Sequence, residues 1–141
     1  MTDNVVNILL IEDDEVDIMN VKRAFKKNNV ENPLYVAHDG VEALEILKGE
    51  SSEIIPLPRI ILLDLNMPRM GGIEFLKNLR SIDELKTISV FVMTTSNEDN
   101  DKVNAYNLNV AGYILKPLSM NRFINAVSTL KNYWRLCEFP S

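Results

Sequence analysis

Polar side chains that could do chemistry together stand directly after four short apolar runs of this chain. They are Glu12, Asp13, Asp64, Thr94 and Lys116. If the runs are parallel strands of one sheet, their carboxyl ends meet at the same edge, and these side chains would converge there. Converging carboxylates are costly to bury without a compensating charge. A cation is therefore expected among them.

An all-oxygen site made by Glu12, Asp13, Asp64 and a nearby backbone carbonyl suits Mg²⁺, which is a hard cation. Lys116 would supply a second, fixed positive charge. A divalent metal and an ammonium group beside an Asp can stabilise phosphoryl transfer onto it, because they share the charge that develops on the phosphoryl oxygens. The pattern predicts that Asp64 is the nucleophile and forms an aspartyl phosphate, with the Thr94 hydroxyl donating to a phosphoryl oxygen.

Each of these residues also has a purely structural interpretation. An Asp after a strand often caps the next helix, and we favour this interpretation for Asp14 and Asp39. A run of acids such as residues 12–15 is typical of a solvated helix N-terminus. The chemical interpretation depends on the complete set, in which the acid pair, the Asp, the Thr and the Lys each end their own strand.

The elements that must position these residues alternate along the chain. Short apolar runs predict strands at residues 6–11, 34–37, 59–63, 89–93 and 112–115. Longer amphipathic stretches predict helices at residues 15–27, 41–47, 72–79, 98–108 and 120–136. Four of the runs are almost continuously apolar, which is typical of strands that are buried on both faces of a parallel sheet.

A strand followed by a helix thus occurs five times within 141 residues. Strands joined through helices run parallel, and right-handed crossovers place helices on both faces of the sheet. The sequence predicts a single α/β domain with an open, doubly wound, five-stranded parallel sheet. Ligands of such sheets bind beyond the carboxyl ends of the strands, where the polar residues stand.

Composition and charge exclude several classes of protein. With 15 Lys and Arg against 20 Asp and Glu, the net charge is −5, which argues against direct binding to nucleic acid. The longest apolar runs are four residues long, whereas a membrane-spanning helix needs about 20. The chain begins without a secretory signal, and its single Cys137 allows no internal disulfide. We therefore expect a cytoplasmic domain with no membrane partner.

The residues at the strand ends resemble the receiver domain of bacterial two-component response regulators. The stretches that carry the resemblance are ILLIEDDE (8–15), ILLDLNMPRMGG (61–72), VFVMTTS (90–96) and AGYILKPL (111–118). The resemblance covers essentially the whole chain, so residues 1–141 are expected to be one receiver domain with no output domain. It implies a flavodoxin-like (CheY-like) fold with strand order 2-1-3-4-5.

The resemblance also implies a role for the acidic residues. Asp64 is the expected phosphoacceptor. Glu12 and Asp13 form the acidic pair, with Asp13 as the direct ligand of Mg²⁺ or Mn²⁺. The backbone carbonyl of Asn66 is the third protein ligand that the family implies.

A second group of residues is implied to sense the phosphoryl group. Thr94 and Lys116 are its expected contacts, and phosphorylation would draw Thr94 inward. The aromatic ring of Tyr113 would then turn into the vacated volume, because packed cores are bistable and not continuously deformable. Pro117 follows Lys116 in a peptide bond that is usually cis in this family.

The last helix and the tail, residues 119–141, carry more apolar side chains than docking onto a sheet needs. Phe123, Val127 and Leu130 form a stripe that predicts core packing. The surplus residues beyond this stripe are Tyr133, Trp134, Leu136 and Phe139. We expect this surplus to be buried against a second copy of the chain, which predicts a homodimer.

Several features resemble the single-domain response regulators that are encoded beside bacterial and cyanobacterial phytochromes. They are the long connection at residues 49–58 with its two prolines, the aromatic end of the chain, and the stretches DLNMP and MTTSN. This resemblance implies that a light-sensing histidine kinase is the phosphodonor. It also implies dimerisation through the last helix and tail.

Other functions remain open on the sequence alone. A metal-dependent phosphatase would use Asp64 as its nucleophile, but hydrolases of that type place a second Asp where this chain has Asn66. A flavodoxin-like cofactor binder would need a Gly-rich or Ser/Thr-rich phosphate loop after the first strand, where acids stand. An adaptor that works without phosphorylation would not need the complete set of acids, Thr and Lys. We therefore expect no enzyme activity beyond the protein's own phosphorylation and autodephosphorylation.

Overall fold

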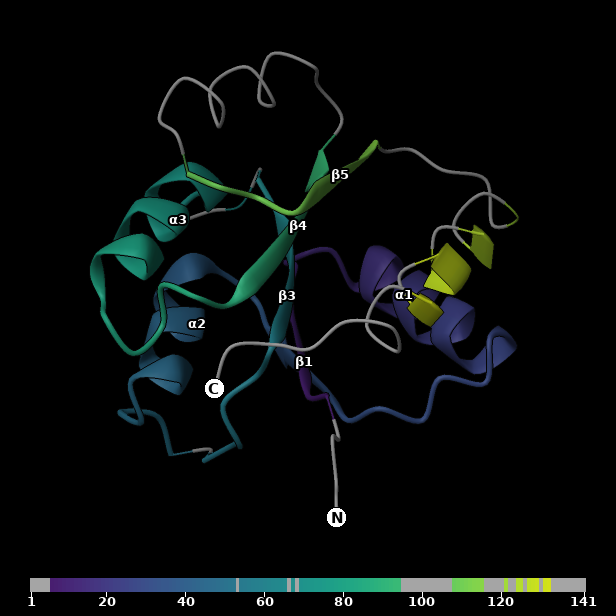
Figure 1. The fold of residues 1–141 in the computed structure, drawn as a ribbon, viewed down its shortest axis with the longest axis horizontal. Helices are drawn as coiled ribbons and strands as arrows, with labels where there is room; N and C mark the ends of the chain where they lie inside the picture. Colours follow the sequence, from purple (N-terminus) through teal and green to yellow (C-terminus); the bar gives the residue numbers. More distant parts are fainter. Residues whose placement is uncertain are drawn as a thin grey trace.

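A sheet of five parallel strands forms the centre of the molecule (Figure 1). The computed structural model describes residues 6–52, 54–65, 67, 69–94, 108–115, 121, 124–125, 127–129 and 131–132. The strands are β1 (Ile8–Ile11), β2 (Leu34–Ala37), β3 (Ile60–Asp64), β4 (Ser89–Thr94) and β5 (Gly112–Leu115). The helices whose bounds lie in this part of the chain are α1 (Glu15–Lys27), α2 (Gly40–Leu47) and α3 (Gly72–Ser81).

The strand order is β2-β1-β3-β4-β5, which confirms the predicted topology. Every pairing is parallel, and Leu10 of β1 lies between Val36 of β2 and Leu62 of β3. Helices α2 and α3 cover one face of the sheet and α1 covers the other (Figure 1). The predicted doubly wound α/β fold is therefore confirmed. Within the described ranges, no helix is both long enough and apolar enough to cross a bilayer.

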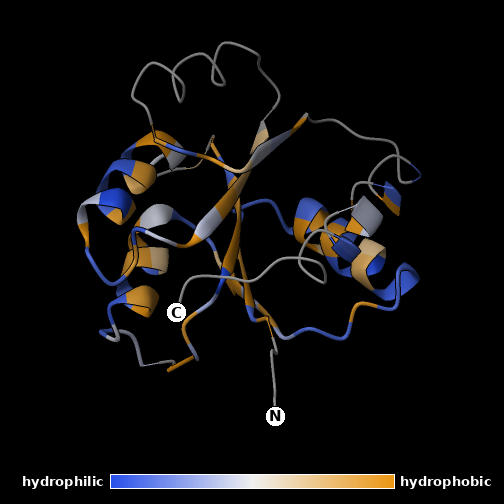
Figure 2. Cartoon of the chain, viewed as in Figure 1, coloured by the Kyte–Doolittle hydropathy of each residue, from blue (hydrophilic) through white to orange (hydrophobic). Residues whose placement is uncertain are grey.

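The sheet is buried on both faces, and this explains its almost continuously apolar strands (Figure 2). Alternate residues of a strand point to opposite faces. Leu9 and Ile11 pack on the side of α2 and α3, in one cluster with Phe75. Leu10 packs on the side of α1, in a second cluster with Phe25. Each of these helices therefore needs only one apolar stripe to cover the sheet. Val16 and Met19 of α1 lie outside that stripe and are 64% and 50% exposed.

The bounds of β2 and β5 are those predicted, whereas β1, β3 and β4 differ from their predicted bounds by one or two residues. The first strand begins at Ile8 rather than at residue 6. Pro33 stands beside this point and has no N–H for the ladder, and the side-chain amide of Asn32 donates to the Val6 carbonyl instead, at 2.9 Å. The third strand covers 60–64 rather than 59–63, because Asp64 still pairs with Met93 of β4.

Two aspartates cap helices, as the sequence predicts. The Asp14 carboxylate accepts hydrogen bonds from the amides of Val16 and Asp17 at the start of α1, at 2.8 and 3.3 Å. The Asp39 carboxylate accepts one from the Glu42 amide at the start of α2, at 2.8 Å. These bonds satisfy amide groups that a helix N-terminus leaves without an intrahelical partner.

The connection between α2 and β3 lies on the surface. It leaves α2 through Gly49, whose φ of 74° suits a glycine at a helix end. Ile54 and Leu57 of this connection are 76% and 52% exposed. Together with Ile46 and Pro58 they line a small hollow of about 120 Å³. Because β3 begins here, this connection lies at the amino ends of the strands.

We predict that Gly72→Ala destabilises the fold by about 1–3 kcal/mol, as expected for overpacking. A methyl group at Gly72 would lie 2.6 Å from the Leu65 Cα and 3.0 Å from the Asp64 carbonyl oxygen. Because both are backbone atoms, relieving this overlap requires a shift of the main chain. Gly71→Ala is the matched control, because its methyl group would meet only the Leu65 carbonyl oxygen, at 3.7 Å. Urea denaturation followed by circular dichroism measures both, and equal losses would contradict the prediction.

Candidate functional site

Three carboxylates come together at the carboxyl ends of β1 and β3. Ile11 of β1 pairs with Leu63 of β3, so the residues that follow them lie side by side. One oxygen from each of Glu12, Asp13 and Asp64 lies within 4.8 Å of the other two. The structure thus brings together the three acids that the sequence singled out.

The backbone and the cap of α1 hold the acid pair in place. The Glu12 amide donates to the Ala37 carbonyl at 2.9 Å and so extends the contact between β1 and β2. The Glu12 carboxylate accepts a hydrogen bond from the Asp14 amide at 3.2 Å, while Asp14 caps α1. The turn between strand and helix therefore sets the position of Glu12, and it leaves Asp13 exposed.

The burial of this cluster fits a hard divalent cation. Glu12 is fully buried and Asp64 is 5% exposed, whereas Asp13 is open to solvent. Negative groups so close together repel one another, and burial strengthens this repulsion because the local dielectric constant is low. An all-oxygen donor set of this kind suits Mg²⁺ or Mn²⁺, and the exposed Asp13 leaves a path from solvent.

The loop between β3 and α3 continues from Asp64 and is tied at both of its ends. The Leu65 amide donates to the Met93 carbonyl at 3.3 Å, and the Gly72 amide donates to the Leu65 carbonyl at 3.0 Å. Asn66, the expected third metal ligand, lies outside the described residues. Asp64 therefore keeps regular strand geometry, and backbone hydrogen bonds fix Leu65 and Gly72 after it.

An ion pair beside the cluster was not predicted from the sequence. The Arg69 guanidinium donates to both carboxylate oxygens of Asp39, with Nε–Oδ2 and Nη2–Oδ1 distances of 2.7 and 3.0 Å. The sequence interpretation gave Asp39 only its role as a helix cap. No periodic pattern links two residues that are 30 positions apart, so nothing in the sequence pointed to this contact.

Asp39 is held in its ionised form. Burial alone would raise the pKa of this carboxyl group, but the hydrogen bonds from Arg69 and from the Glu42 amide outweigh it. Together with the positive charge of Arg69, they hold the pKa of Asp39 below its usual range. The ion pair is therefore fully formed at neutral pH.

The expected phosphoryl-sensing residues are only partly described. Thr94 is the last residue of β4 and pairs with Leu115 of β5, so its backbone reaches the same sheet edge as Asp64. The Thr94 side chain, Lys116 and Pro117 lie outside the described part of the chain.

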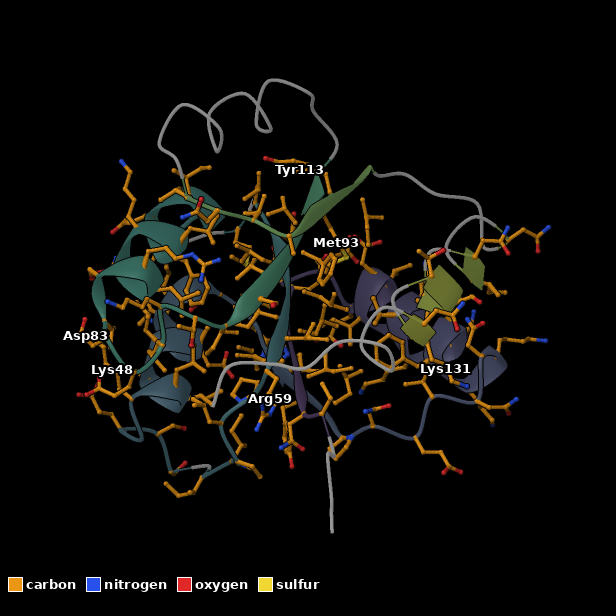
Figure 3. All side chains as sticks on the ribbon, viewed as in Figure 1. Lys48, Arg59, Asp83, Met93, Tyr113 and Lys131 are labelled. Carbon is orange, nitrogen blue, oxygen red and sulfur yellow. The ribbon has the colours of Figure 1, made fainter. Side chains whose placement is uncertain are left out.

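Tyr113 of β5 is half-buried and packs against the cluster on the side of α2 and α3. Met93 of β4 points to the opposite face of the sheet, toward α1 (Figure 3). Tyr113 thus lies at the border between core and surface.

The last helical segment packs against α1. Val127 is fully buried, which confirms its predicted role in the core. The Asn28 side chain donates to the Ile124 carbonyl at 2.9 Å, and the Lys131 ammonium donates to the Asn28 carbonyl at 2.8 Å (Figure 3). The remaining stripe and surplus residues lie outside the described ranges; they are Phe123, Leu130, Tyr133, Trp134, Leu136 and Phe139.

Comparison with known sequences gives one family. The family model of the response regulator receiver domain matches residues 8–128. Response regulator Rcp1 of Synechocystis is 33% identical over 128 residues, which cover 90% of this chain and 87% of Rcp1. The probable methanogenesis regulatory protein FilR2 of Methanothrix harundinacea is 36% identical over 127 residues, which cover 90% of this chain and 82% of FilR2.

Solved structures agree with this result. The phosphorylated cyanobacterial phytochrome response regulator RcpA superimposes with a TM-score of 0.85 at 32% identity, covering 96% of this chain and 99% of RcpA. The Mn²⁺-bound form of Rcp1 superimposes with a TM-score of 0.83 at 31% identity, with the same coverage of both chains. With the carboxylate cluster at the carboxyl edge of a 2-1-3-4-5 sheet, these similarities show that the chain belongs to the response regulator receiver domain family.

Proposed function

We propose that this response regulator accepts a phosphoryl group on Asp64 from a histidine kinase, with Mg²⁺ bound by its acidic cluster. The observation that carries the proposal is the approach of Glu12, Asp13 and Asp64 to within 4.8 Å at the carboxyl edge of the sheet. The phosphorylated state of the similar RcpA and the Mn²⁺-bound form of the similar Rcp1 support it.

The proposed reaction is a direct phosphoryl transfer. A carboxylate oxygen of Asp64 attacks the phosphorus atom of a phosphohistidine, so that a P–O bond forms and the P–N bond breaks. The bonding electron pair leaves with the imidazole nitrogen, which takes up a proton. Asp64 suits this role because it is the last residue of a buried strand and its backbone is fixed by pairing with Met93. Proximity and orientation of this kind lower the barrier to transfer.

Glu12, Asp13 and the backbone carbonyl of Asn66 would hold the metal together with Asp64. A divalent cation supplies positive charge beside the phosphoryl oxygens when it is bound. We propose that Lys116 balances the remaining charge and that the Thr94 hydroxyl donates to a phosphoryl oxygen. Tyr113 would then change orientation, and the signal would leave through protein contacts.

The kinase that we propose as phosphodonor is a phytochrome. The similarity to RcpA, a cyanobacterial phytochrome response regulator, supports this assignment. The acidic net charge of −5 and the single Cys137 support a cytoplasmic protein that meets its partners without binding nucleic acid. Asn66, at a position where aspartate-based hydrolases place a second acid, argues against turnover of external substrates.

The metal requirement gives a direct test. We predict that a small phosphodonor such as phosphoramidate labels the protein in the presence of Mg²⁺. Replacing Mg²⁺ with a chelator at equal ionic strength should slow labelling by about 100-fold, because charge on the phosphoryl oxygens is then unbalanced. Intact-protein mass spectrometry measures the gain of one phosphoryl group. Equal labelling rates in both buffers would contradict the metal site, and steady hydrolysis of small phosphate esters would favour a phosphatase.

We also propose that the protein forms a homodimer through residues 119–141. The surplus apolar side chains Tyr133, Trp134, Leu136 and Phe139 support this proposal, because one stripe of the helix is enough to dock it on the sheet. Sedimentation velocity should give a dimer at micromolar concentration, and Trp134→Ala should shift it toward the monomer. A monomer both with and without phosphorylation would contradict the proposal.

A further inference from the structure

The ion pair between Asp39 and Arg69 joins two segments that flank the acidic cluster. Asp39 lies just beyond β2 and caps α2, and it is 7% exposed. Arg69 belongs to the loop that runs from Asp64 to α3. Both carboxylate oxygens are engaged by the guanidinium, at 2.7 and 3.0 Å. A bidentate contact between an Arg guanidinium and a carboxylate fixes the orientation of the two groups as well as the distance between them.

The same two segments touch at a second point. The Gly40 amide donates to the Met70 carbonyl at 3.3 Å. A methyl group on Gly40 would lie within 2.8 to 2.9 Å of Met70 atoms, so the backbones approach as closely as a glycine allows. The loop is therefore pressed against the start of α2, and the ion pair lies beside this contact.

The backbone of Arg69 adopts a conformation that is costly for a residue other than glycine. Its φ is 61°, in the left-handed region that glycine adopts easily. A residue with a Cβ pays about 1–2 kcal/mol for this conformation. The ion pair with Asp39 provides a reason for an arginine here, because a glycine would satisfy the backbone and lose the link.

The ion pair between Asp39 and Arg69 connects segments that lie on the two sides of the acidic cluster. On one side, Ala37 at the end of β2 accepts the Glu12 amide at 2.9 Å, and Asp39 follows two residues later. On the other side, the loop that holds Arg69 begins directly after Asp64. The ion pair thus connects the strand edge that positions Glu12 to the loop that follows Asp64.

We propose that Asp39 and Arg69 are a positioning pair, which holds the loop after Asp64 in the geometry in which the acidic cluster binds a divalent cation. This inference rests on the proposed metal site and adds two residues that are not ligands. Residues that orient metal ligands typically change metal affinity by about 10–100-fold when they are replaced.

The test is Mn²⁺ binding, measured by electron paramagnetic resonance of the free ion. Asp39→Asn keeps the helix cap, because Asn is as good an N-cap residue as Asp, but it removes the negative charge that pairs with Arg69. Arg69→Gly keeps the backbone conformation and removes the side chain. Each should weaken Mn²⁺ binding by about 10-fold. Glu50→Gln, at an exposed position shortly after α2, also removes one negative charge and should leave the affinity unchanged.

Two further measurements separate positioning from a general loss of structure. The folded fraction of each metal-free variant at the assay temperature, measured by circular dichroism, should equal that of the wild type. The double variant Asp39→Asn/Arg69→Gly should bind Mn²⁺ no more weakly than either single variant, because both remove the same link. Arg69→Lys should regain part of the affinity that Arg69→Gly loses.

The outcomes distinguish this inference from the function on which it rests. Wild-type protein that fails to bind Mn²⁺ would overturn the proposed metal site, and the positioning role with it. Wild-type protein that binds Mn²⁺ while both single variants bind it equally well would overturn the positioning role alone. Losses that add in the double variant would show that Asp39 and Arg69 act separately, and this result would also overturn the pair.

Discussion

The Asp64→Asn variant is expected to accept no phosphoryl group from any donor. The neutral amide has no anionic oxygen with which to attack phosphorus, and the acidic cluster loses one of its three carboxylates. Because Asn has nearly the same volume and Asp64 lies at the end of β3, the fold should be retained. Transfer from a phosphorylated histidine kinase, followed by intact-protein mass spectrometry, measures the loss against the wild type.

Asp14→Asn is the matched control for this experiment. It makes the same chemical change at the same sheet edge, but Asp14 caps α1 and is not one of the three clustered acids. Asparagine is also a good cap, so this variant should fold and be labelled normally. Labelling that survives Asp64→Asn would overturn the assignment of the phosphoacceptor, and labelling that is lost in both variants would show that the effect is not specific to Asp64.

The Arg80→Met variant should lose about 3 kcal/mol of unfolding free energy. The Arg80 guanidinium of α3 donates four hydrogen bonds of 2.8–3.0 Å to backbone carbonyls; these belong to Lys86, Ile88, Leu108 and Asn109. Burial lowers the pKa of this guanidinium from its usual value. The bonds to Leu108 and Ile88 are part-buried, whereas those to Lys86 and Asn109 are exposed. The expected loss therefore comes mainly from the first two carbonyl groups, because a buried group left without a partner costs about 1–3 kcal/mol.

Urea denaturation of Arg80→Met, followed by circular dichroism, measures this loss. Arg23→Met is the control, because it makes the same substitution at an exposed position of α1. Exposed substitutions of this kind usually change stability by no more than about 0.5 kcal/mol. If Arg80→Met also lowers the free energy of unfolding by no more than about 0.5 kcal/mol, water replaces the guanidinium at the four carbonyl groups without cost.

The sequence predicted the features of this fold that arise from local patterns. Apolar runs located the five strands, and the polar residues at their ends predicted the approach of Glu12, Asp13 and Asp64. Both results depend on periodicity and on the geometry of parallel sheets, which are general. The strand bounds were less accurate, since the start of β1 depends on Pro33, a neighbour in space that the run itself does not contain.

Contacts between distant side chains were not predictable. The bonds of Arg80 reach carbonyls up to 29 positions away, and the pair of Asp39 and Arg69 spans 30 positions. Such contacts depend on how loops are placed after the helices have packed, and a single sequence carries no periodic signal for them. The left-handed conformation of Arg69, with a φ of 61°, was not predicted either, because no pattern in the sequence indicates it.

The connection between α2 and β3 has a practical consequence. It enters the sheet at the amino ends of the strands, whereas the carboxylate cluster lies at their carboxyl ends. Ile54 is the most exposed of its large apolar side chains, at 76%. A cysteine introduced at this position, with Cys137 replaced by serine, gives an attachment point for a fluorescent reporter. The dye would then be separated from the carboxylate cluster by the full length of the buried strand β3.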